Sequence, residues 1–254
     1  MENKTHKLSE LREDLINLGL KSDDRILIHS SLRSVGKIEG RAEGLIALLM
    51  EYLHEGAILM PAHTWMSVNK NNPRFIHAET PSGVGALTEV FRNTPGVIRS
   101  AHPTHSNCGW GVDIDDLLRD QEKFNTPCGP KSTYARLDEK NYKILLVGVN
   151  FSRNTAIHAL EERAKVPGRL SPETEALEVE FADGRVISSP QHRHIGPTSE
   201  NYVRIEPMLK AMGILKEGKL GNAKVLHMET KPLFETVTNL LRKDPEYFTR
   251  NSID

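Results

Sequence analysis

The order of apolar and amphipathic segments in residues 24–60 constrains the fold more than any other feature of this chain. Residues 24–29, with Ile26-Leu27-Ile28 at their centre, predict a strand. Residues 41–53 carry leucines and an isoleucine at helical spacing, and residues 57–60 predict a second strand. A strand, a helix and a strand in this order are typical of an α/β domain, in which helices cover a sheet.

The rest of the chain continues this alternation. Residues 177–187 alternate around Asp183-Gly184, which is a strong hairpin signal. Residues 64–80 are polar and predict a surface loop or lid. The sequence therefore predicts one domain over residues 1–254, with a mixed sheet flanked by helices, an added β-hairpin and C-terminal helices. Further helices are expected at residues 8–20, 84–91, 199–212 and 231–242, and further strands at residues 96–100 and 144–149.

Composition excludes several classes of protein. The 254 residues include 33 basic and 34 acidic side chains, a balance that argues against a general nucleic-acid or anionic-membrane surface. No apolar run is long enough to span a bilayer and the N-terminus lacks a signal-peptide core, so we expect a cytoplasmic protein. Two cysteines are too few for a disulfide scaffold. The sequence does not fix the oligomeric state, and a homodimer is compatible with it.

Residues 143–164 place a histidine beside two carboxylates at the predicted junction between a strand and a helix. His158 falls near the first turn of that helix, where the helix dipole disfavours imidazolium and favours the neutral form that a general base needs. Glu161 and Glu162 follow at spacings that share a face with His158, so either could orient the ring. Taken alone, such a pair is more often solvated than catalytic.

A second group of reactive side chains lies between two predicted strands. His102, His105 and Cys108 recur at three-residue intervals, and zinc binds both imidazole and thiolate. A zinc-dependent hydrolase using these three residues is therefore an alternative of a different class. Pro103 favours irregular backbone here, in which the histidines would instead bond locally or contact a ligand.

A third group is Gln191-His192-Arg193-His194. Alternate residues of a strand face the same way, so His192 and His194 could point together into a cleft. The other interpretation is an exposed, polar end of a strand.

The polar segments that follow the first two predicted strands are candidates for ligand binding, because ligands of α/β sheets usually bind at the C-terminal ends of strands. His29, Ser30 and Ser31 follow the first strand, and His63 follows the second. Exposed amides and hydroxyls at such a turn can hold a phosphate or the arm of a cofactor. The nucleophile elbow, the P-loop and the dinucleotide fingerprint are absent from the sequence.

Taken together, these segments resemble the aminoglycoside 3-N-acetyltransferases, and they occur in that family's order from about Leu8 to Leu241. The matching pieces are His29-Ser30-Ser31-Leu32-x-Ser34-Val35-Gly36, Met60-Pro61-x-His63-Thr64, Arg99-Ser100-x-His102-Pro103-Thr104-His105-Ser106, Pro127-x-Gly129-Pro130-x-Ser132, Leu146-Val147-Gly148-Val149 with Asn154-Thr155-Ala156-Ile157-His158-x-x-Glu161, and Gly218-x-x-Gly221-Asn222-Ala223.

The resemblance implies a fold unlike the commoner acetyltransferase superfamily, acetyl-coenzyme A as cosubstrate, an amine as acceptor, antibiotic resistance as the biological setting and no metal. It implies that His158 is the general base and that Glu161 assists it. The acceptor is expected beside His63, Glu162, His192 and His194. Coenzyme A is expected at His29, Ser30, Ser31, Leu32, Arg33, Ser34, Val35, His102 and Ser106.

The acceptor region departs from the family. Members that modify aminoglycosides often carry an acidic segment after the His-x-x-Glu helix, whereas residues 188–194 here are neutral to basic. The 3-amino group of an aminoglycoside is the acceptor by resemblance, and a smaller, anionic or sugar-like primary amine is the alternative.

Overall fold

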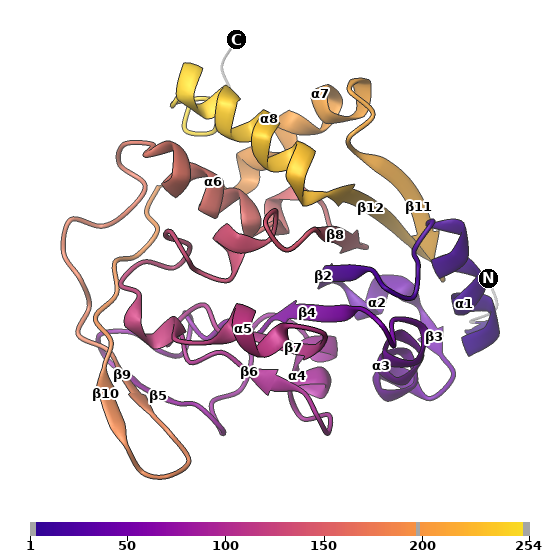
Figure 1. The fold of residues 1–254 in the computed structure, drawn as a ribbon, viewed down its shortest axis with the longest axis horizontal. Helices are drawn as coiled ribbons and strands as arrows, with labels where there is room; N and C mark the ends of the chain where they lie inside the picture. The colour runs from indigo at the N-terminus through magenta and orange to yellow at the C-terminus, as the bar shows by residue number, and fades with distance from the viewer. Residues whose placement is uncertain (1–3, 197–198, 251–254) are drawn as a thin grey trace.

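A mixed seven-stranded sheet organises the molecule in the computed structural model, which describes residues 4–196 and 199–250 (Figure 1). β2 is parallel to both of its neighbours, β8 and β4, and the remaining pairs are antiparallel. The mixed sheet predicted from the sequence is thus confirmed. In spatial order the strands are β11 (Lys216–Leu220), β12 (Ala223–Glu229), β8 (Tyr142–Val147), β2 (Arg25–Ser30), β4 (Ala57–Pro61), β7 (Asn107–Gly111) and β6 (Ile98–Arg99).

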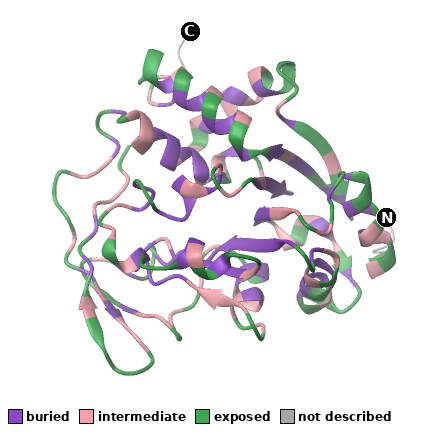
Figure 2. Ribbon diagram, in the orientation of Figure 1, coloured by how far each residue is buried: buried purple, intermediate pink, exposed green. Residues whose placement is uncertain are grey.

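The central strands are buried on both faces, and alternate side chains enter two separate hydrophobic clusters (Figure 2). Ile26 and Ile28 of β2 pack in one cluster, and Leu27 between them packs in the other. Because successive side chains of a strand point to opposite faces and both faces are buried, these strands have continuous apolar sequences. The first cluster is covered by α1 (Leu8–Asn17), α3 (Arg41–Tyr52) and α4 (Ala86–Arg92), and the second by α5 (Ile114–Leu118), α6 (Ala156–Ala164), α7 (Glu206–Ala211) and α8 (Thr230–Lys243).

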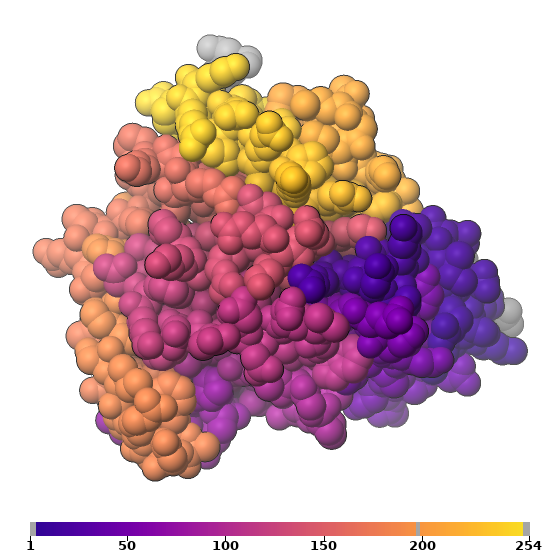
Figure 3. Space-filling model, in the orientation of Figure 1, coloured from indigo at the N-terminus to yellow at the C-terminus, as the bar shows by residue number. Residues whose placement is uncertain are grey.

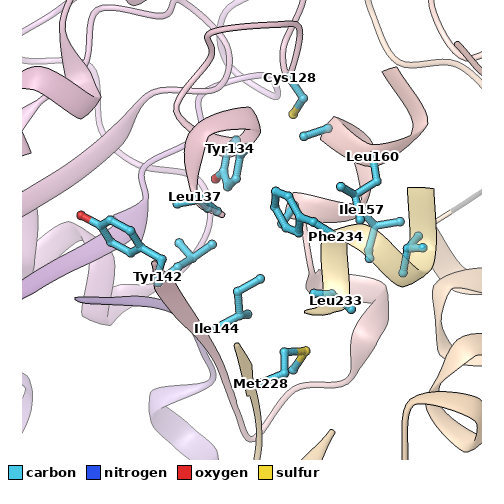
Figure 4. Close-up of a cluster of buried hydrophobic side chains, with 14 of the residues drawn as sticks. Cys128, Tyr134, Leu137, Tyr142, Ile144, Ile157, Leu160, Met228, Leu233 and Phe234 are labelled. Carbon is cyan, nitrogen blue, oxygen red and sulfur yellow. The ribbon is translucent and has the colours of Figure 1, made fainter. Parts of the chain in front are cut away.

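The second cluster fixes the helix that carries His158. Ile157 and Leu160 of α6 face Leu233 and Phe234 of α8, and all four side chains are fully buried (Figure 4). α8 is held at its start by Thr230, whose hydroxyl donates to the carbonyl oxygen of Tyr142 at 2.6 Å. Packing on both sides therefore sets the position of α6 against the sheet.

A smaller sheet forms beside the main one, in the order β10-β9-β5. β9 (Glu178–Glu180) and β10 (Val186–Ser188) form the predicted hairpin, and β9 also pairs in parallel with β5 (Arg74–Ile76). The hairpin thus pairs with a strand inside residues 64–80, which the sequence predicted to be a surface loop or lid. The hairpin and this strand lie at one edge of the molecule in the space-filling view (Figure 3). At the opposite side, β1 (Thr5–His6) pairs with β3 (Lys37–Ile38).

Some elements differ from the sequence expectation. β7, β11 and β12 were not predicted, and the loop expected at residues 30–36 contains the short helix α2 (Leu32–Val35). The helix expected at residues 199–212 is a 3₁₀ segment, Ser199–Ile205, followed by α7, because Pro207 at the start of α7 cannot continue a helix. Three 3₁₀ turns connect other elements, at Gln121–Lys123, Tyr134–Arg136 and Phe151–Arg153. Within the described ranges, none of the helices combines the length and the apolar character that crossing a bilayer requires.

Candidate active site

α6 brings His158 and Glu161 together on one face. His158 is the third residue of the helix, and its Nδ1 lies 3.1 Å from Oε2 of Glu161. Tyr202, from the 3₁₀ segment before α7, places its hydroxyl 2.7 Å from both of those atoms. The helical spacing predicted from the sequence is thus realised as a direct hydrogen bond, with Glu161 rather than Glu162 as the partner.

Glu161 is held as a buried anion. Its side chain is 1% exposed, and Arg169 binds it with two hydrogen bonds, from Nε to Oε1 at 2.9 Å and from Nη2 to Oε2 at 3.1 Å. Burial alone would raise the pKa of Glu161, but the hydrogen bonds from His158 and Arg169 lower it to about 2. A carboxylate that is fixed and charged in this way can orient a neighbouring imidazole.

The hydrogen bonds select one tautomer of His158. Because Tyr202 donates its proton to Glu161, the Nδ1 of His158 carries a hydrogen and points it at the same carboxylate oxygen. The other ring nitrogen, Nε2, is then the basic one, and the hydroxyl of Ser199 is 3.4 Å from it. Burial, assisted by the nearby His194, lowers the pKa of His158 to about 4, although Glu161 acts to raise it. The imidazole of His158 is therefore neutral at physiological pH.

His158 belongs to a buried group of five histidines, here called the histidine cluster: His63, His102, His105, His158 and His194. The rings of His158 and His194 are stacked, with centroids 4.1 Å apart and planes inclined by 16°. His105 stands edge-on to His194 at 5.8 Å and lies 4.6 Å from His63. Sequence reasoning placed these residues in three separate groups, and the fold brings them together.

Other members of the histidine cluster are kept neutral by burial. His63 and His105 have a pKa well below the usual value for histidine because they are desolvated and lie near other imidazoles. The pKa of His102 is lowered to about 4 by burial. Its Nδ1 accepts hydrogen bonds from the backbone amides of Thr104 and His105, so only Nε2 carries a proton. His63 bonds the hydroxyl of Tyr134 at 2.7 Å.

Glu162 contacts His194 and not His158. Its Oε1 is 3.0 Å from Nε2 of His194 and accepts a hydrogen bond of 3.0 Å from the backbone amide of Cys128. Gln191 and His194 form isolated bridges and not a strand, and His192 and His194 bond different partners. His192 instead bonds the carbonyl oxygen of Ser171 at 2.7 Å.

The alternative zinc site at His102, His105 and Cys108 is not assembled in the structure. Cys108 lies on β7 and packs with Met60 in the hydrophobic cluster beneath α3 and α4, while His102 uses its Nδ1 to cap backbone amides. The rings of His102 and His105 contact each other in the histidine cluster, whereas Cys108 packs in that hydrophobic cluster. Within the described part of the chain, the residues that could share a metal ion are Cys128, Glu162 and His194.

The segment expected to hold coenzyme A is well ordered by its own hydrogen bonds. Ser31 caps α2, since its hydroxyl accepts hydrogen bonds from the amide and the hydroxyl of Ser34. Ser34 lines a groove of about 600 Å³ at the C-terminal ends of β2 and β8. Arg153 and Lys224 line the same groove and supply positive charge. His29 is buried instead, and desolvation lowers its pKa to about 3.

Two other residues expected at the cofactor are buried and hydrogen-bonded within the protein. Ser106 is fully buried, donates to the carbonyl oxygen of Ala62 at 2.6 Å and accepts from Arg99 at 3.1 Å. His102 is buried against Thr126, whose carbonyl oxygen is 3.2 Å from its Nε2. Neither side chain lines the groove that contains Ser34.

Sequence reasoning missed Arg169 and Tyr202. Arg169 lies in the irregular segment after α6, and Tyr202 lies 41 residues from Glu161. Neither position carries a local pattern that distinguishes it. The usable signal is physical: a carboxylate on the apolar side of α6 requires a buried cation and a donor, and a nearby arginine is the natural candidate.

The fold and the comparisons with known proteins define the chain as an N-acyltransferase. The sequence profile of the aminoglycoside 3-N-acetyltransferases matches residues 27–242, so the chain belongs to this family. It is 30% identical over 241 residues to aminoglycoside N(3)-acetyltransferase IV from Salmonella, covering 94% of this chain and 89% of that protein. It is 27% identical over 237 residues to the acetyltransferase-like protein YokD of Bacillus subtilis strain 168, covering 84% of each.

Solved structures agree with this assignment. A histidine-to-alanine variant of aminoglycoside acetyltransferase AAC(3)-IVa, in complex with a gentamicin, superposes with a TM-score of 0.87 at 28% identity and covers 99% of this chain and 94% of that one. AAC-IIIb in a binary complex with CoASH superposes with a TM-score of 0.82 at 22% identity, covering 98% and 100% of the two chains. The fold expected from the sequence is thereby confirmed.

Proposed function

We propose that the protein transfers the acetyl group of acetyl-coenzyme A to a primary amine, the 3-amino group of an aminoglycoside, with His158 as general base and Glu161 as the residue that orients it. The observation that carries the proposal is the buried chain from Arg169 through Glu161 to Nδ1 of His158. It leaves Nε2 of a neutral imidazole as the proton acceptor.

The reaction needs a base at this point. The amine nitrogen attacks the thioester carbonyl, and its proton passes to Nε2 of His158 as the carbon–nitrogen bond forms. The carbon–sulfur bond then breaks, and the departing thiolate takes up a proton to give coenzyme A. The imidazolium formed in the transition state is stabilised by the carboxylate of Glu161, which stays ionised because Arg169 holds it.

The groove at the ends of β2 and β8 is suited to the donor. Arg153 and Lys224 can bind phosphate groups, and the same space is also lined by Gly148, Asn150 and the acidic Glu206. Ser34 joins this groove to the segment that the sequence assigned to coenzyme A. The family membership of the chain supports the same donor.

A second candidate acceptor is a small amine without several positive charges. Glu161, the carboxylate that contacts His158, is already paired with Arg169. A polycationic aminoglycoside is best recognised by carboxylates that are free to accept its ammonium groups. This pairing favours an acceptor of lower charge.

Release of free thiol from acetyl-coenzyme A tests the proposal, with gentamicin and apramycin in one series and small primary amines in another. Acetylated product is identified by mass spectrometry. Turnover with an aminoglycoside supports the first acceptor, and turnover confined to small amines supports the second. Absence of acetylated product in both series, with coenzyme A bound, would contradict the proposed reaction.

A further inference from the structure

Beside the proposed base lies a compact set of groups that the proposed proton transfer does not use. The thiol of Cys128, the carboxylate of Glu162 and the imidazole of His194 offer ligand atoms that all lie within 4.8 Å of one another. They come from three segments: the loop before the Tyr134–Arg136 turn, α6, and the segment after the β9–β10 hairpin. Cys128 lies at the edge of the hydrophobic cluster, near Leu160 of α6 (Figure 4).

The negative charge of Glu162 is less well compensated than that of the adjacent Glu161. Glu162 is 5% exposed, and its ion-pair partner is the imidazole of His194. The adjacent Glu161 is bound by the permanently charged Arg169, whereas no Lys or Arg of the described chain forms such a pair with Glu162. A buried carboxylate of this kind favours a nearby cation.

His194 and Cys128 can also take part in further bonding. Nδ1 of His194 is buried and lacks a hydrogen-bond partner among the described residues. Burial and the nearby Glu162 keep the pKa of the Cys128 thiol well above its usual value, so Cys128 is a neutral thiol without metal. A metal ion would displace that proton, because thiolate is the binding form.

We infer that Cys128, Glu162 and His194 form a binding site for Zn²⁺ or a similar divalent transition-metal ion. One sulfur, one nitrogen and one oxygen ligand are the set that zinc accepts, and a water molecule completes four-coordination. The bound ion neutralises the thiolate and the carboxylate together. It is not a resident cofactor, and the proposed acetyl transfer does not need it.

Metal binding at this site inhibits the proposed reaction. The ring of His194 stacks on that of His158 at 4.1 Å, so an ion bound to His194 places positive charge beside the base. Positive charge at this distance disfavours the imidazolium that His158 must form during proton transfer. This part of the inference rests on the proposed function, whereas binding of the metal does not.

Co²⁺ is the probe for binding, because a cobalt–thiolate bond gives a charge-transfer absorption band in the near ultraviolet. We expect this band to saturate at one equivalent of Co²⁺ and to disappear when Zn²⁺ is added. Cys128→Ser should lose the band. Cys108→Ser is the matched control, since Cys108 is equally buried in the other cluster and should leave the band intact. Absence of a thiolate band in the unsubstituted protein, or its persistence in Cys128→Ser, would overturn the site.

Inhibition is measured separately by thiol release from acetyl-coenzyme A. We expect Zn²⁺ to suppress turnover, a chelator to restore it, and Cys128→Ser to turn over normally while resisting Zn²⁺. Binding of Co²⁺ without suppression by Zn²⁺ would overturn the inhibitory role and leave the site standing. Turnover by a protein that gives no thiolate band when Co²⁺ is added would overturn the site and leave the proposed function standing.

Discussion

Arg169 binds Glu161 through two parallel hydrogen bonds, and both side chains are almost completely removed from solvent, at 2% and 1% exposure. A buried pair of this kind contributes less to net stability than its geometry suggests, because both ions lose their hydration. Its value here is electrostatic: the arginine keeps Glu161 ionised, and Glu161 fixes the tautomer of His158. The pair therefore connects the packing of α6 to the chemistry of the site.

Replacing Glu161 by Gln should lower turnover and shift its pH dependence. Glu161 acts to raise the pKa of His158, so its loss should lower that pKa further and move the acid limb of kcat/KM to lower pH. The profile of kcat/KM against pH measures this. A purely structural role for Glu161 would lower activity without moving the limb, and that result would contradict the orienting role.

Tyr202→Phe should reduce stability while preserving the packing of the ring against Phe248, whose centroid is 4.9 Å away. The substitution removes the hydrogen bond to the ionised Glu161, and such bonds contribute about 1.5–3 kcal/mol. Urea titration of both proteins measures the change in the free energy of unfolding. An unchanged midpoint would show that the hydroxyl does not stabilise the buried carboxylate.

Acid should destabilise the protein through its buried histidines. In the folded protein, five histidines have a pKa below the unfolded value of about 6.5. The pKa is about 3 for His29, about 4 for His102 and His158, and well below the usual value for His63 and His105. As pH falls below about 6.5, these histidines bind protons in the unfolded chain but not in the folded chain. The free energy of unfolding therefore decreases down to about pH 4.

The expected slope is up to about 1.4 kcal/mol per pH unit for each such histidine. Urea midpoints between about pH 7 and about pH 5 measure it. His102→Gln should reduce the slope of the free energy of unfolding against pH by the contribution of one histidine, up to about 1.4 kcal/mol per pH unit. A midpoint that stays constant over this range would contradict the burial of neutral histidines.

Phe234→Ala tests the packing that positions α6. The side chain is fully buried between α8 and α6, and its removal should cost about 3–5 kcal/mol because the cavity collapses only in part. Met212, which is 56% exposed, supplies the control: Met212→Ala should change the free energy of unfolding by less than about 0.5 kcal/mol. Equal effects of the two substitutions would be inconsistent with the described core.

The sequence predicted the parts of the fold that have strong local patterns. The strand at residues 24–29, the helix at residues 41–53 and the hairpin around Asp183-Gly184 are all present. β7 was missed because Gly109 and Gly111 remove the usual strand signature. Gly109 is required by tertiary packing, since a Cβ at this position would lie 2.2 Å from the side chain of Ile114.

The site was predictable where it is local and not where it is assembled by folding. His158 and Glu161 are one helical turn apart, so their hydrogen bond follows from spacing. The stack of His194 on His158 and the bonds from Arg169 depend on irregular segments after α6, for which the sequence offers no period. The alternative zinc site is not assembled, because β7 places the thiol of Cys108 in a hydrophobic cluster.

The most direct test of the account is the turnover of His158→Ala, measured as thiol release from acetyl-coenzyme A in the presence of an accepted amine. Removing a general base should lower kcat about 10²-fold or more while binding of acetyl-coenzyme A is retained. His54→Ala is the matched control, because His54 is an exposed histidine that lies outside the histidine cluster, and it should turn over normally. If His158→Ala turns over at the same rate as His54→Ala, His158 is not the base and the central claim is contradicted.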